Sequence, residues 1–94
     1  MTKTVKGVTY GDLDAALRQM GYVREDCARE RIYRTERNPD AFVSLPQWPF
    51  DQEIWEAHLL AARQIPDAYG VYDGNEFDLL LLRVTHKDTV ATPA

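Results

Sequence analysis

Residues 9–21 read TYGDLDAALRQMG and carry the local signals of one helix from start to end. Thr9 followed by Asp12 resembles a capping box, with Asp in place of the usual Glu or Gln. From Leu13 to Met20, apolar residues recur at i, i+3, i+4 and i+7, which is one stripe of a helix. Gly21 stands where a left-handed C-terminal cap belongs. The stretch therefore predicts a helix over residues 10–20.

Short β-forming segments follow this helix and alternate with turn signals. Residues 22–23 are apolar and predict a first strand, and the polar residues 24–29 predict a loop. Residues 31–37 mix β-formers with charge, as an exposed strand does, and residues 41–45 predict a third strand. Asn38-Pro39-Asp40 between them is turn chemistry, so these two strands are expected to form a hairpin.

The C-terminal half predicts two further elements. An apolar stripe between Asp51, as the cap, and Pro66, as the terminator, predicts a helix over residues 51–65. Residues 75–85 have helical spacing, but Asp73-Gly74 before them is also a hairpin signal. A short helix is favoured here, and a strand remains the alternative.

This order of elements predicts an α+β fold, an α-β-β-β-α sandwich. Two helices cover one face of a three-stranded antiparallel sheet, and a short C-terminal helix follows. The strands would supply Ile32, Val43 and Leu45 to the core. Residues 1–8 are expected to be an N-terminal arm, residues 9–86 a single domain, and residues 87–94 a flexible tail.

Composition limits the class of function. The 94 residues contain one cysteine, Cys27, so no intrachain disulfide can form and a reducing compartment is favoured. No apolar run is long enough for a signal peptide or a membrane span, so a cytoplasmic protein without a membrane partner is expected. The few His and Cys residues predict neither a metal site nor a cofactor.

The net charge of −4 argues against a general nucleic-acid binder, because phosphate neutralisation dominates that affinity. The charge is unevenly distributed, however. Residues 1–37 have a balance of +2 and residues 38–94 a balance of −6. A mildly basic surface in the N-terminal half therefore remains compatible with RNA contact.

Several short motifs resemble the HicA family of toxin–antitoxin ribonucleases, over about residues 9–84. The matching segments are Thr9-Tyr10-Gly11-Asp12-Leu13, Leu17, Gly21-Tyr22, Ile32-Tyr33-Arg34, Val43-Ser44-Leu45-Pro46 and Gly70-Val71. The resemblance implies a fold like that of double-stranded-RNA-binding domains, action on RNA and an antitoxin protein as partner. The family's catalytic histidine lies in a Gly-Ser-His triplet before the second strand. Here the triplet is Ala28-Arg29-Glu30, and His58 is the first histidine of the chain.

The missing histidine predicts a domain without the family's histidine-dependent cleavage, since the base cannot be carried over. Whether the chain is an enzyme stays open, and Glu30 is the candidate base of a divergent mRNA endoribonuclease. Its alternative is an ordinary solvated carboxylate. His58 lies on the apolar stripe of the second helix and is expected to be packed.

Two sets of residues are candidates for binding. Arg31, Tyr33 and Arg37 lie on one face of a strand by alternation, and Arg29 precedes them. These residues are candidates for binding RNA, the arginines by contacting phosphates and the Tyr33 ring by stacking on a base. Surface salt pairing is the alternative. Trp48 and Phe50 are candidates for binding a protein partner, with core packing as the alternative. The leading hypothesis is a HicA-like domain that binds RNA or an antitoxin-like protein. Its competitor is a protein-interaction module that keeps the fold without binding RNA.

Overall fold

The computed structural model describes residues 3–86. It contains five strands and three helices in these residues. They are β1 (Thr4–Thr9), α1 (Tyr10–Gln19), β2 (Val23–Asp26), β3 (Glu30–Arg34), β4 (Val43–Pro46), β5 (Glu53–Trp55), α2 (Glu56–Ala68) and α3 (Gly74–Thr85). The predicted flexible tail, residues 87–94, lies outside the described residues.

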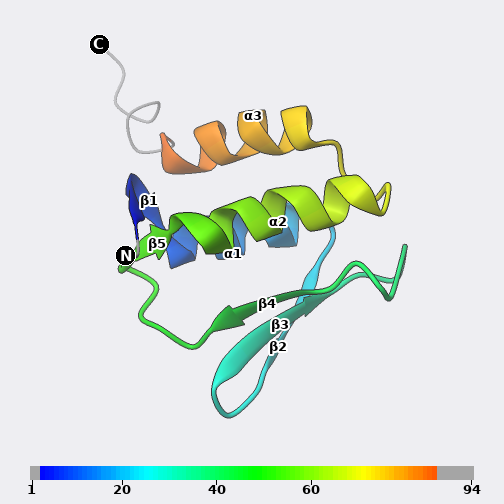
Figure 1. The fold of residues 1–94 in the computed structure, drawn as a ribbon, viewed down its shortest axis with the longest axis horizontal. Helices are drawn as coiled ribbons and strands as arrows, with labels where there is room; N and C mark the ends of the chain where they lie inside the picture. The colour runs from blue at the N-terminus through cyan, green and yellow to red at the C-terminus, as the bar shows by residue number, and fades with distance from the viewer. Residues whose placement is uncertain (1–2, 87–94) are drawn as a thin grey trace.

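The predicted α+β architecture is confirmed. Strands β2, β3 and β4 form an antiparallel sheet in that order. Helices α1 and α2 lie on the same face of this sheet, and α3 packs against both of them on the side away from the sheet (Figure 1). The helix favoured for residues 75–85 is likewise present as α3. The molecule is thus layered as sheet, helix pair and single helix.

Helix α1 forms as its local signals predict. The Thr9 hydroxyl accepts a hydrogen bond from the backbone N–H of Asp12 at 3.2 Å, and the Asp12 carboxylate accepts one from the N–H of Thr9 at 3.0 Å. This is a complete capping box. At the other end Gly21 has φ +100°, a conformation that costs a glycine little. The chain then turns directly into the sheet.

Residues 4–9 are not the predicted N-terminal arm. They form β1, which pairs antiparallel with β5 to make a second, two-stranded sheet. The backbone N–H of Glu56 donates to the carbonyl of Lys3 at 2.8 Å and extends this pairing. The prediction of an arm was wrong because the partner strand, β5, begins 44 residues after the end of β1, and the residues near β1 give no local signal of this pairing.

The second helix is displaced from its predicted bounds of residues 51–65. Residues 53–55 are extended in β5, and α2 begins at Glu56 without a side-chain cap from Asp51. Pro66 does not end the helix, which continues to Ala68. Proline disfavours a helix interior, but α2 continues for two residues past it, and the backbone N–H of Tyr69 then donates to the carbonyl of Ile65 at 3.2 Å.

Two strands also differ in length from their prediction. Strand β2 continues to Asp26, where residues 24–29 were expected to be a loop, because all four of its residues pair with β3. Strand β3 ends at Arg34 instead of residue 37. An Asx turn then reverses the chain, with the Asn38 side chain accepting from the N–H of Asp40 at 3.0 Å.

The core lies between the sheet and the helix pair and between the helix pair and α3. The β2-β3-β4 sheet contributes Tyr33, Val43 and Leu45 to it, whereas Ile32, predicted to face inward, is only partly buried. Apart from them, the core consists of Tyr10, Leu13, Ala16, Leu17, Met20, Tyr22, Ala41, Ile54, Ala62, Val71, Phe77, Leu80 and Val84. None of the helices in residues 3–86 has the length and apolar composition to cross a bilayer.

Candidate functional site

The strand face predicted to contact RNA is the face that the helices cover. Tyr33 is 1% exposed and Arg31 is 7% exposed, and both lie on the inner side of β3. The expectation that they form an exposed surface with Arg37 is therefore wrong. The alternation of the strand was predicted correctly, but the side that faces solvent was not.

Tyr33 is part of a buried polar cluster. Its hydroxyl donates to Asp14 Oδ1 at 2.6 Å, and Arg24 Nη1 donates to the same oxygen at 3.1 Å. Burial raises the pKa of Tyr33, and the neighbouring Asp14 raises it further. The cluster joins α1 to β2 and β3, so these polar side chains serve the fold.

Arg31 fixes the segment that leads from β4 to β5. Its guanidinium donates to the carbonyl of Trp48 at 2.9 Å and lies 4.0 Å from the centre of the Phe50 ring. Arg24 approaches the same ring at 5.4 Å. The structure thus brings one predicted RNA-binding residue together with both predicted partner-binding residues. Their contacts hold a connection in place, and Phe50 is an exposed ring with arginine on it.

The remaining predicted residues are distributed over the surface. Arg37 donates to the carbonyls of Val71 at 2.9 Å and Met20 at 3.0 Å, which ties the end of α1 to the loop before α3. Arg29 is exposed, and its carbonyl accepts from the N–H of Gln47. Glu30 is exposed on the outer side of the sheet and accepts a short hydrogen bond from the Ser44 hydroxyl.

His58 sits in an aromatic cluster, as expected for a packed histidine. The Tyr10 hydroxyl lies 2.7 Å from His58 Nδ1, and the Trp55 ring stacks on His58 at a centroid distance of 5.3 Å. Trp48 packs against the other rings. The backbone N–H of Trp55 donates to the same Tyr10 hydroxyl. Burial lowers the pKa of His58, in agreement with a neutral ring.

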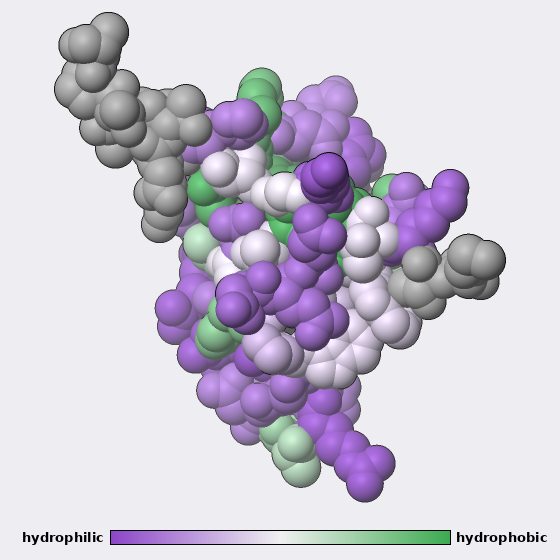
Figure 2. Space-filling model, turned by 90° about the vertical axis from the view of Figure 1, so that its left-hand side faces the viewer, coloured by the Kyte–Doolittle hydropathy of each residue, from purple (hydrophilic) through white to green (hydrophobic). Residues whose placement is uncertain are grey.

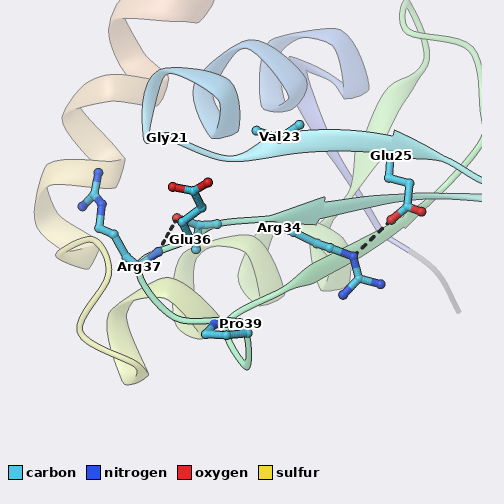
Figure 3. Close-up of a pocket in the computed structure, with 8 residues that line it drawn as sticks. Gly21, Val23, Glu25, Arg34, Glu36, Arg37 and Pro39 are labelled. Carbon is cyan, nitrogen blue, oxygen red and sulfur yellow. Dashed lines mark hydrogen bonds and ion pairs between the residues drawn. The ribbon is translucent and has the colours of Figure 1, made fainter.

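A depression of about 760 Å³ opens on the outer side of the sheet, at the end nearest the hairpin turn (Figure 3). It is lined by Gly21, Val23, Glu25, Arg34, Thr35, Glu36, Arg37 and Pro39. Figure 3 shows Arg34 reaching across to Glu25, to which its Nε donates at 3.1 Å. Val23, directly opposite Arg34 in the sheet, is 71% exposed.

The rest of the outer sheet face continues this mixture of apolar and charged groups. The Phe42 ring is exposed, with the Arg34 guanidinium 5.8 Å from its centre. Ile32 pairs with Ser44 across the sheet, and Glu30 lies beyond them. This outer face could have been found from the sequence by assuming that Tyr33 is buried. Strand alternation then requires Glu30, Ile32 and Arg34 to point outward together.

Comparisons of the chain with protein-family models, curated proteins and solved structures found no match. Among residues 3–86, no group of three or more His, Cys, Asp or Glu side chains is placed to hold a metal ion.

Proposed function

We propose that this chain is a non-catalytic, HicA-like domain that binds an antitoxin-like protein through the outer face of the β2-β3-β4 sheet. The observation that carries the proposal is the 71% exposure of Val23 beside Arg34 and Phe42, over a depression of about 760 Å³. A large apolar side chain in such a position loses water only when another molecule covers it.

The chemistry of this face suits a protein more than a nucleic acid. Phe42 and Arg34 are residue types that are enriched in the centres of protein interfaces. Glu25 and Glu36 border them and would repel phosphates. The partner should offer an apolar side chain for the depression and a basic group near Glu36.

The RNA hypothesis loses its two central residues. Arg31 and Tyr33 are occupied by backbone carbonyls and by Asp14, so neither is free to contact a phosphate or a base without disrupting the fold. The net charge of −4 weakens attraction to RNA further. Arg29 and Arg34 are the exposed arginines that the RNA hypothesis could still use.

Cleavage through Glu30 is also poorly supported. The Glu30 carboxylate is exposed on the sheet surface, already accepts a hydrogen bond from the Ser44 hydroxyl, and does not line the depression. The neutral His58 is on the helix side of the molecule, in contact with Tyr10 and Trp55.

A photo-crosslinking amino acid at position 23 or 42 tests the proposal in the native host. Both positions should capture the same protein, and position 69, at the end of α2 and about as exposed as position 42, should not. Arg34→Glu should weaken capture from position 23 because it removes the guanidinium that lies over Phe42 and places a carboxylate beside Glu25.

Titration of a mixed RNA pool over a salt series provides the opposing measurement. We expect negligible binding at physiological salt. Binding that weakens with salt and is lost in the Arg29→Ala/Arg34→Ala double variant would overturn the proposal in favour of RNA. Equal capture at positions 23 and 69 would also contradict it.

A further inference from the structure

A second exposed apolar surface lies on the opposite side of the molecule, on the outside of α3. Phe77, Leu80 and Val84 form the buried face of this helix, whereas Leu79 is 58% and Leu82 is 55% exposed. Residues three apart lie on one side of a helix, so the two exposed leucines are neighbours. Apolar residues reach the surface at the upper edge of Figure 2, at the height of α3 in Figure 1.

Helix α2 extends this surface. Arg63 on α2 donates to both carboxylate oxygens of Asp78 on α3, at 2.9 and 3.0 Å, which sets the register of the two helices. The helices run antiparallel (Figure 1). Leu60, one turn before Arg63, and Leu82, one turn after Asp78, are therefore displaced in the same direction along the pair. Leu60 is 46% exposed, so α2 also presents a leucine to solvent at this end of the pair.

Charged residues flank the leucines in a defined order. Glu76 precedes Leu79 by three positions and Arg83 follows it by four, so both lie on the same flank of the exposed stripe. On the other flank Asp78 is engaged by Arg63. Glu76 and Arg83 are in no ion pair within residues 3–86.

We propose that this surface binds a second copy of the chain through antiparallel pairing of the two α3 helices. With a two-fold axis midway between Leu79 and Leu82, Leu79 of one copy packs against Leu82 of the other. The same axis places Glu76 opposite Arg83 of the second copy, twice per dimer. In antiparallel pairing the positive end of each helix dipole also lies beside the negative end of the other, which is favourable. In a parallel pair Glu76 would instead lie beside Asp78 of the second copy, two positions away along the axis, so like charges would meet.

The size of the surface predicts a weak dimer. A helix of 12 residues is about 18 Å long, and with Leu60 it offers less area than a standard interface. Dimerisation should therefore depend on concentration, with monomer and dimer in exchange.

Sedimentation equilibrium of the full chain over a concentration series tests the proposal through a charge exchange. Arg83→Glu and Glu76→Arg should each weaken dimerisation about tenfold or more, because each places like charges opposite one another at two symmetric positions. The double variant Glu76→Arg/Arg83→Glu should restore the wild-type dissociation constant to within a few-fold. Leu82→Glu should leave only monomer.

The substituted side chains are all exposed, so far-ultraviolet circular dichroism and thermal unfolding should be unchanged. Val23→Glu, on the outer sheet face, is the matched control and should dimerise as the wild type does. A monomeric wild type at every concentration would overturn the proposal. A double variant as weak as the two single variants would overturn the antiparallel arrangement.

Discussion

The hydroxyl of Tyr33 should be worth more to stability than that of Tyr22, although both are buried and both donate one hydrogen bond. Tyr33 donates to the carboxylate of Asp14 at 2.6 Å, whereas Tyr22 donates to the neutral carbonyl of Ala41 at 2.7 Å. Substitution by phenylalanine removes only the hydroxyl in each case. The comparison isolates the effect of the acceptor's charge.

The expected magnitudes follow from the acceptors. A hydrogen bond to a charged group contributes about 1.5–3 kcal/mol, and a neutral one about 0.5–1.5 kcal/mol. In Tyr33→Phe the carboxylate of Asp14 keeps Arg24 as a donor but stays buried, so we expect a loss of about 2 kcal/mol. Tyr22→Phe should cost about 1 kcal/mol.

Urea denaturation at pH 7 measures both free energies of unfolding, and the slopes should be unchanged. Alkaline pH adds an independent check. The folded pKa of Tyr33 is raised above 10, so its contribution is present below pH 10 and is lost as the pH rises beyond it. Tyr33→Phe should therefore lose less stability above pH 10 than the wild type. A cost for Tyr33→Phe no greater than that for Tyr22→Phe would refute this account of the cluster.

Two further substitutions test other contacts. Burial lowers the folded pKa of His58, so its contribution is present above pH 6.5 and is lost as the pH falls below it. Urea unfolding at pH 7.5 and pH 5 should show this loss in the wild type but a smaller one in His58→Gln, and equal losses would exclude His58 as its source. Arg37→Ala leaves the carbonyls of Met20 and Val71 without their donor and should cost about 1–3 kcal/mol by the same method. Arg29→Ala, with an exposed side chain, should stay within about 0.5 kcal/mol, and equal costs for the two variants would contradict a stabilising role for the Arg37 contacts with Met20 and Val71.

Elements with local signals could be predicted from the sequence. The capping box at Thr9 and the glycine at position 21 defined α1 to within a residue. The order of α1, three antiparallel strands and α2 followed from patterning, and with it the α+β class. These signals depend only on neighbours within one or two turns of the chain.

Elements that depend on distant partners could not be predicted. Strand β1 exists because β5 pairs with it, and the same pairing keeps residues 53–55 out of the helix predicted to include them. Neither segment alternates clearly between apolar and polar residues. Their conformation is decided by tertiary hydrogen bonds.

The candidate surface was assigned to the wrong side of β3 for a physical reason. Arginine is mostly exposed in proteins and tyrosine only intermediate, so a face with two arginines, Arg31 and Arg37, around Tyr33 suggested solvent. Inside the fold each polar end has a partner, Asp14 for Tyr33 and the Trp48 carbonyl for Arg31, which makes burial tolerable. Asp14 is on another element, so the sequence of the strand does not reveal it.

The two proposed surfaces lie on opposite sides of the helix pair, and this arrangement has a consequence for binding. The outer sheet face with Val23 points away from α3, so pairing through Leu79 and Leu82 would leave both sheet faces of a dimer open (Figure 1). Such a dimer presents two copies of one site at a fixed separation. A partner that is itself dimeric would then bind with higher avidity than one domain allows, without any additional contact. Leu82→Glu should bind a dimeric partner more weakly than the wild type does, while its affinity for a monomeric partner stays unchanged. That result would show that the two surfaces act together although no residue belongs to both.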